Sequence, residues 1–309
     1  MTLSDWYQDT VTRVKQNGFV GIRESAYQLY LGALRQMDGM YEYGTPIFDR
    51  EWDVLVILDA CRADMMRDVA DEYGLDGEAI YSNASYSKSW MDRNFAPQYD
   101  DQKRRTAYVT GNPFSSETVQ DDEFAALREA WRYSWDAEIG TIHPRPITDH
   151  AVEVWRTVAP DRMIVHYMQP HGPFVSKPDL AAGFDDADTF ANREERGIWE
   201  RIRHGDVDKA IVQTAYLDNL RYVLDEVTET LLRSIDADHV VLTADHANAL
   251  GEWGIWGHPP NIPIPAIRRV PWYVTSAADA GDYDPDPQMG EAETNDEAVV
   301  ERLRNLGYV

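Results

Sequence analysis

Two patterns of apolar positions divide the chain. Residues 2–16 and 20–37 carry apolar side chains at spacings of three and four, which predicts two amphipathic helices. From Pro46 onward, short β-branched apolar runs alternate with stretches of helical period. This alternation is typical of a parallel sheet whose strands are joined by helices. We therefore expect an N-terminal helical arm over 1–45 and an α/β domain over 46–309.

The α/β part is expected to form a central, mostly parallel sheet with helices on both faces. Its predicted strands are residues 52–60, 105–111, 162–169, 239–246 and 270–276. Its predicted helices are residues 62–73, 121–132, 147–158 and 207–234, and a last helix from about residue 294. Segments 174–206 and 277–293, rich in Asp, Gly, Pro and Ala, are expected to be surface insertions or lids.

Charge and cysteine content exclude several classes of protein. Among 309 residues, 54 Asp and Glu outnumber 29 Lys and Arg, and the net charge of −25 would repel a nucleic-acid backbone. The single cysteine, Cys61, cannot form a disulfide within the chain, and we expect it to be a small buried side chain. No apolar run approaches the roughly 20 residues of a membrane span, which predicts a soluble protein without a transmembrane segment.

Other features concern the surroundings of the protein. Lysine is rare, with five residues, and 34 Asp outnumber 20 Glu, a bias that indicates a salt-adapted, halophilic surface. The N-terminus carries acidic residues and Trp6 where a secretory signal needs a basic start and an apolar stretch, so we expect a cytoplasmic location. Because the arm has few basic residues, we expect it to pack on its own domain or on a second subunit rather than on a membrane.

Polar residues follow three of the predicted strands. In an open parallel sheet, ligands bind beyond the carboxyl ends of the strands. The residues at those ends are Asp59, His166, His171, Asp245, His246 and, slightly further on, His258. Carboxylates and imidazoles that meet at one sheet edge suit a divalent cation, and mixed nitrogen and oxygen ligands favour zinc or manganese over calcium.

With these residues in place, the sequence resembles the alkaline phosphatase superfamily and, within it, the sulfatase-like branch. The string TADHANALGEWGIWGH resembles the family's DHG…LGEHGLWGH, HYMQPHGPF resembles its HxPHxP loop, and VERLRNLGYV resembles its last helix. The resemblance covers about residues 50–309 and implies a metal-dependent hydrolase of phosphate or sulfate esters. It implies one or two divalent ions, zinc or manganese first, with calcium or magnesium as alternatives. The implied metal ligands are Asp59, Asp245, His246 and His258.

The resemblance also implies a nucleophile at the start of a helix, where backbone N–H groups can hold an anion. The matching segment is AIYSNASYSKSWMDRNF, residues 79–95. Ser87 is the expected nucleophile, because similar sequences have a Ser or Thr three residues before a Trp at this point, and Ser85 is the runner-up. His171 would contact the anion or protonate the leaving oxygen, and His166 is a candidate for substrate binding.

The sequence departs from the family at two places. It lacks the C/S-x-P-S-R string of true sulfatases, which weakens the case for sulfate esters. Gly111 is followed by Asn112 where the family often has a lysine that touches the substrate anion, so Lys88 or Arg62 is expected to supply that charge. Three tryptophans, Trp90, Trp253 and Trp256, stand beside the motifs and are expected to wall the site off from water.

Several alternatives stay open at this point. The first is a transferase that moves phospho-groups onto glycan- or lipid-linked acceptors. The second is a binding protein that keeps the fold without catalysis. The expected partner is an anionic ester, free or linked to a glycan or lipid, and a homo-oligomer is an open alternative to a monomer.

Overall fold

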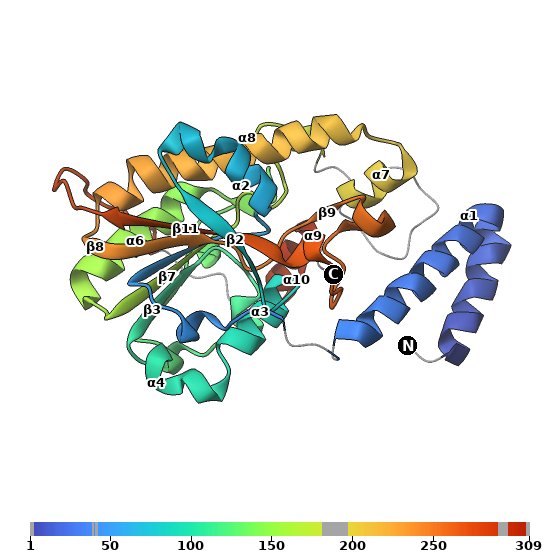
Figure 1. Cartoon of the computed structure of the whole chain (residues 1–309), viewed down its shortest axis with the longest axis horizontal. Coiled ribbons are helices and arrows are strands. Elements are labelled where there is room, and N and C mark those ends of the chain that lie inside the picture. The colour runs from blue at the N-terminus through green and yellow to red at the C-terminus, as the bar shows by residue number, and fades with distance from the viewer. Residues whose placement is uncertain (1–2, 39, 41–42, 181–196, 290–295, 307–309) are drawn as a thin grey trace.

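The computed structural model describes the whole chain apart from residues 1–2, 39, 41–42, 181–196, 290–295 and 307–309 (Figure 1). At its centre is a seven-stranded sheet in the order β2-β11-β8-β1-β7-β3-β4. The strands are β1 Val54–Leu58, β2 Gly77–Tyr81, β3 Thr106–Thr110, β4 Ala126–Glu129, β7 Arg162–Tyr167, β8 Ala237–Thr243 and β11 Arg269–Ala277. Two small hairpins pair β5 Trp135–Asp136 with β6 Thr141–Ile142 and β9 Ala249–Leu250 with β10 Trp256–Gly257.

The sheet is mostly parallel, as predicted. Strand β1 runs parallel to both of its neighbours, β7 and β8, and β3 runs parallel to β7 and β4. Only β11 reverses, and it pairs antiparallel with β8 and β2 at one edge of the sheet. The carboxyl ends of β1, β7, β8 and β3 therefore meet at one edge, where the polar residues were expected to gather.

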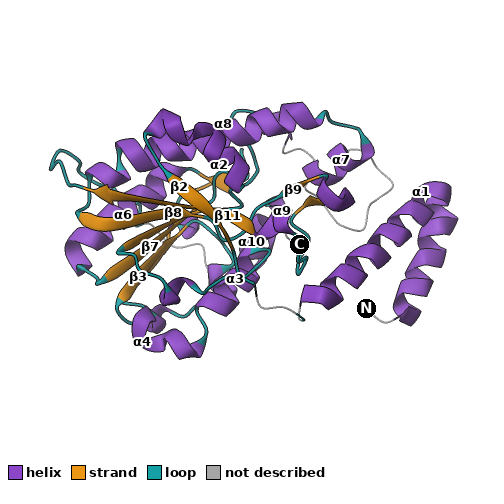
Figure 2. Ribbon diagram, viewed as in Figure 1, coloured by secondary structure: helices purple, strands orange, loops and turns teal. Residues whose placement is uncertain are grey.

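Helices cover both faces of the sheet, which Figure 2 shows as orange strands between purple layers. The α-helices of the described residues are α1 Leu3–Asp38, α2 Ala63–Val69, α3 Ser87–Asn94, α4 Asp100–Lys103, α5 Ser115–Thr118, α6 Pro144–Val158, α7 Ile198–His204, α8 Lys209–Glu229, α9 Pro265–Arg268 and α10 Asp296–Asn305.

All five residues of β1 are buried, because alternate side chains enter two different cores. Val54, Val56 and Leu58 pack with α2, α6 and α8, whereas Leu55 and Ile57 pack with α3 and α10.

The predicted helix over 121–132 is wrong. Strand β4 occupies its middle and pairs in parallel with β3, and the short 3-10 turns Asp121–Glu123 and Ala130–Arg132 flank it. The apolar spacing of the segment fits a helix, but pairing with β3 gives its backbone hydrogen-bond partners that local pattern cannot reveal. Strand β2 was also not predicted, because it is a short, largely exposed edge strand.

The two expected surface insertions are partly described. Residues 181–196 and 290–293 lie outside the described residues, as do Thr294 and Asn295, which were expected to begin the last helix. Of the rest, residues 198–204 form α7, whereas 278–289 have no regular secondary structure.

The arm contains the two expected helices. Helix α1 is interrupted at Gly18, whose φ of 55° and ψ of −125° break the helix, and Figure 1 shows the two halves side by side as a hairpin. The second half contacts the rest of the protein through Glu24, which is 1% exposed and lies 2.6 Å from Arg203 of α7. Within the described chain, no helix combines the length and apolar character that crossing a membrane requires.

Candidate active site

The carboxylates at the ends of β1 and β8 lie side by side because the two strands are neighbours. Asp59 follows β1 directly and Asp245 lies two residues beyond β8, and both are fully buried. Oδ1 of Asp245 accepts hydrogen bonds from the backbone N–H groups of Ala60 at 3.1 Å and His246 at 2.9 Å. Its other oxygen, Oδ2, has no hydrogen-bond donor among the described residues. The backbone thus fixes the carboxylate and leaves one oxygen available for a ligand.

His166 of β7 completes a compact group with the two carboxylates. Its Nε2 lies 3.5 Å from Oδ2 of Asp59 and 4.0 Å from Oδ2 of Asp245, and its Nδ1 lies 3.1 Å from the hydroxyl of Tyr108. When Nδ1–H donates to Tyr108, the lone pair of Nε2 faces both carboxylates. One ligand atom from each of Asp59, His166 and Asp245 lies within 4.8 Å of the others.

These three residues fit a divalent cation. Nε2 of His166 and Oδ2 of Asp245 are buried polar atoms without hydrogen-bond partners in the described structure, an arrangement that costs free energy unless a ligand satisfies them. Two carboxylates also supply the negative charge that a buried cation needs. The group could therefore bind a metal ion.

Three further imidazoles border the carboxylates. Nε2 of His246 lies 3.4 Å from Oδ2 of Asp245 and 3.7 Å from Oδ1 of Asp59. The ring of His258 lies 4.5 Å from that of His246 and 5.1 Å from that of His171, measured between ring centroids. Burial lowers the pKa of both His171 and His258, and the neighbouring imidazoles lower that of His258 further. Both rings are therefore neutral near pH 7, the state in which imidazole binds a metal.

The surroundings of Asp59 favour its charged form, whereas those of His171 and His258 favour the neutral form. Burial opposes ionisation of Asp59, but its contact with His166 and the surrounding imidazoles outweigh burial, so its pKa lies below the ordinary value. The carboxylate is therefore ionised at neutral pH, as a metal ligand must be.

Ser87 lies beside Asp59 and His246. It is the first residue of α3 and is completely buried. Its Oγ lies 3.3 Å from Oδ2 of Asp59 and 3.4 Å from Nε2 of His246. The runner-up, Ser85, instead accepts a hydrogen bond from the backbone N–H of Asn261. The structure thus brings Ser87 to the carboxylates and imidazoles, and its role as nucleophile stays a prediction.

The two predicted cations form their ion pairs outside this cluster, although Nη1 of Arg62 also donates to the backbone carbonyl of Asn248 at 2.6 Å. Nζ of Lys88 lies 3.1 Å from Asp92, one turn further along α3. The guanidinium of Arg62 pairs with Asp64 at 2.6 Å and Glu252 at 2.9 Å. Contact of either residue with substrate stays a prediction. Cys61, as expected, is fully buried, and burial raises the pKa of its thiol.

Two buried asparagines belong to the site and were not among the predicted residues. Nδ2 of Asn112 donates to Oδ2 of Asp59 at 2.7 Å. Oδ1 of Asn248 lies 2.6 Å from Nδ1 of His258, and its amide donates to the hydroxyl of Tyr216. Asn112 lies two residues beyond β3, so the rule that identified Asp59 could also have identified it.

No protein-family model matches the chain, and no curated protein matches it either. Comparison with solved structures does give matches. The soluble domain of lipooligosaccharide phosphoethanolamine transferase A from Neisseria meningitidis has 13% identity and a TM-score of 0.43, over 72% of this chain and 75% of that chain. The phosphonate monoester hydrolase of Agrobacterium radiobacter has 12% identity and a TM-score of 0.44, over 72% and 68%.

A 2-O glycosaminoglycan sulfatase, BT1596, is similar to the same degree. Its identity is 12% and its TM-score 0.44, over 77% of this chain and 66% of that chain. At this identity the likeness concerns the fold alone, so the chemistry must be argued from the residues of the site.

Proposed function

We propose that the protein is a metal-dependent enzyme that cleaves a phosphate or sulfate ester, with Ser87 as its nucleophile. The observation that carries the proposal is the position of Ser87 Oγ, within 3.4 Å of both a carboxylate and an imidazole in a buried cluster. In the same cluster, buried atoms of His166 and Asp245 lack hydrogen-bond partners. A serine that merely capped a helix would have no need of these neighbours.

In this proposal Asp59, Asp245, His246 and His258 hold one or two divalent ions, with zinc or manganese favoured, and His166 is a further candidate ligand. A divalent ion at this place would lower the pKa of the serine hydroxyl and neutralise charge on the non-bridging oxygens of the ester.

The chain's own groups carry the remaining steps. Oγ of Ser87 gives up its proton as it forms a bond to phosphorus or sulfur. The bond from that atom to the leaving oxygen breaks, and His171, which is not among the proposed metal ligands, passes the proton released by Ser87 to that oxygen. A water molecule then attacks the esterified serine, releases the anion and restores the hydroxyl. If an acceptor alcohol replaces the water, the same site is a transferase.

The test combines metal analysis with a matched pair of variants. Ser87→Ala should retain the metal content of the parent and lose nearly all turnover of p-nitrophenyl phosphate, bis-p-nitrophenyl phosphate and p-nitrophenyl sulfate. Ser85→Ala, which removes a neighbouring serine that contacts the backbone of Asn261, should retain turnover. Equal activity of both variants would overturn the role of Ser87.

Further outcomes separate the alternatives. Turnover in water alone supports the hydrolase, whereas turnover that depends on an added glycan or lipid alcohol supports the transferase. If the protein binds no metal and shows no turnover after addition of zinc, manganese, magnesium or calcium, both enzyme hypotheses are excluded. The binding protein is then the remaining alternative. We propose a salt-adapted, cytoplasmic protein, so these assays belong in high salt, where the net charge of −25 is screened.

A further inference from the structure

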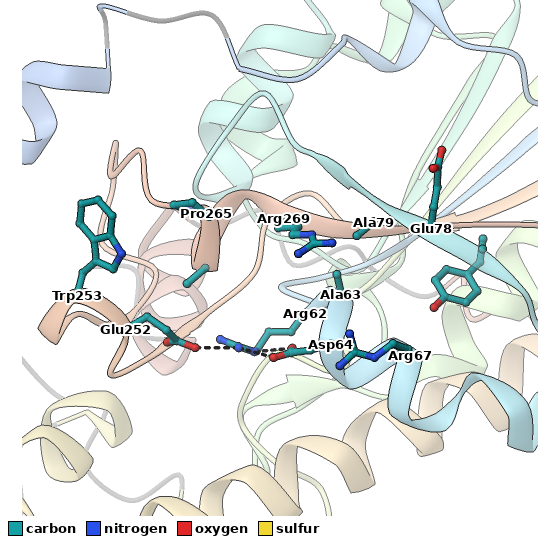
Figure 3. A pocket seen from close by; sticks show the side chains of 13 residues that line it. Arg62, Ala63, Asp64, Arg67, Glu78, Ala79, Glu252, Trp253, Pro265 and Arg269 are labelled. Carbon is teal, nitrogen blue, oxygen red and sulfur yellow. Dashed lines mark hydrogen bonds and ion pairs between the residues drawn. The ribbon is translucent and has the colours of Figure 1, made fainter.

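A pocket in the described part of the chain shares no residue with the metal cluster. Its volume is about 400 Å³, and it opens between the start of α2, strands β2 and β11, and the turn after β9 (Figure 3). This volume is within the range of small-molecule sites. None of the carboxylates, imidazoles or serines of the candidate active site lines it.

Trp253 forms one end of this pocket in an unusual conformation. Its φ is 56° and its ψ 21°, in the left-handed region that bulky residues rarely adopt. The strain does not serve to bury the indole, because the residue is 63% exposed. The backbone carbonyl of Trp253 accepts a hydrogen bond from the hydroxyl of Tyr30 at 3.1 Å, which helps to hold the turn. A strained residue that presents a large ring to solvent indicates a ligand platform.

Arginines line the other part of the pocket, as Figure 3 shows. Arg62 is already paired with Asp64 and Glu252 and forms the floor. Arg269 is exposed and forms no ion pair within the described part of the chain, and Arg67 has only a 3.6 Å contact with Asp68.

The charged side chains that line this pocket balance one another. Its three arginines are matched by three carboxylates, so it is neutral in a chain of net charge −25. In Figure 3 the third carboxylate, Glu78, points away from the arginines. Arg67 and Arg269 therefore remain able to bind an anion, with the fork of donors that suits phosphate.

We propose that this pocket binds a small organic phosphate that carries a ring. The ring stacks on Trp253, the phosphate binds Arg269 and Arg67, and the carboxylates at the floor accept hydrogen bonds from hydroxyl groups. Sugar phosphates and nucleoside monophosphates both combine a ring, hydroxyl groups and a phosphate. The pocket holds this ligand without cleaving it, because no nucleophile or metal-binding cluster of the active site reaches it.

The test is calorimetric titration of the full chain in a Ser87→Ala background, so that no ligand is consumed. Glucose 6-phosphate and AMP are titrated as the two sources, with glucose, adenosine and inorganic phosphate as fragments. At least one of the two phosphates should bind, and each fragment should bind about tenfold more weakly or not at all. No binding of either phosphate overturns the proposal.

Variants locate the site. Arg269→Gln and Trp253→Gly should each weaken binding by about tenfold, whereas Arg104→Gln, at an exposed arginine on α4's C-terminal side, should not. Trp253→Gly should leave the melting temperature unchanged or raise it, because glycine adopts a positive φ without strain. Asp245→Asn should leave binding intact, so the result does not depend on the proposed catalysis. Equal affinity in Arg269→Gln and Arg104→Gln overturns the proposal.

Discussion

Asn112 donates a hydrogen bond of 2.7 Å to Oδ2 of Asp59, although their strands, β3 and β1, are separated by β7. The same oxygen faces Nε2 of His166 at 3.5 Å and Oγ of Ser87 at 3.3 Å. Asn112 therefore orients the carboxylate between its possible ligand and the expected nucleophile. A lysine at this position would bring a positive charge to the site. The amide of Asn112 brings a hydrogen-bond donor without a charge.

Removing this donor should weaken metal binding. We expect Asn112→Ala to lower the affinity for zinc or manganese about 10- to 100-fold, because the groups that orient a metal ligand contribute on this scale. Competition with a chelating dye measures the change. Asn112→Ser keeps a hydrogen-bond donor on a shorter side chain, so its metal affinity should lie between that of the parent protein and that of Asn112→Ala. Unchanged affinity in Asn112→Ala would show that Asp59 needs no such support.

The sequence identified the site because its residues follow strands that are easy to recognise. Strands β1, β7 and β8 are continuous apolar runs buried on both faces, and their parallel pairing brings Asp59, His166 and Asp245 together. The sequence could not show that His166 lies against both carboxylates, because this depends on the register in which β7 pairs with β1. Pairing of His166 with Ile57 places it one residue short of the strand end, with its ring toward both carboxylates.

Other parts of the structure carried weaker signals. Strand β4 reads as a helix because four residues are too few to show a two-residue period against apolar spacings that also fit a helix. The pairing of Arg62 with Glu252 joins residues 190 apart in the sequence, and only the folded chain reveals that these charges are neutralised.

His166 offers a way to separate metal binding from substrate binding. If His166 only contacts substrate, His166→Ala should raise KM and leave metal affinity unchanged. We expect instead that it lowers metal affinity at least about tenfold, because Nε2 lies within 4.0 Å of both carboxylates and has no hydrogen-bond partner in the described chain. Direct measurement of bound metal and of KM in His166→Ala distinguishes a metal ligand from a residue that contacts only the substrate. His239→Ala, which changes a histidine of β8 outside the cluster, is the control.

The metal-free protein should lose stability as the pH falls below about 6.5. The pKa values of His171 and His258 are lowered by burial, so the unfolded chain binds protons in a range where the folded chain does not. As the pH falls below the ordinary pKa of histidine, the free energy of unfolding therefore decreases. The decrease is up to about 1.4 kcal/mol per pH unit for each group.

Thermal melting of the chelator-treated protein between about pH 5 and pH 8 tests this dependence. His258→Gln should flatten the curve, because it removes one of the two groups. A curve of the same slope in the parent and in His258→Gln would contradict the assignment.

The arm should be needed for full activity because it supports the loop that carries His258. The hydroxyl of Tyr30 donates to the carbonyl of Trp253, and Nε of Arg35 donates to that of Pro260, both at 3.1 Å. The buried ion pair between Glu24 and Arg203 fixes the same helix to α7.

Glu24→Gln would leave Arg203 without its buried carboxylate partner, a change that costs about 3 kcal/mol or more. We expect a lower melting temperature, faster proteolysis within α1 and reduced ester turnover. Arg23→Gln, one residue away and exposed, should change none of these. Reduced stability with full turnover would mean that the loop around His258 keeps its conformation when the arm is released. In that case the arm would contribute to stability, and the contacts of Tyr30 and Arg35 would have no part in catalysis.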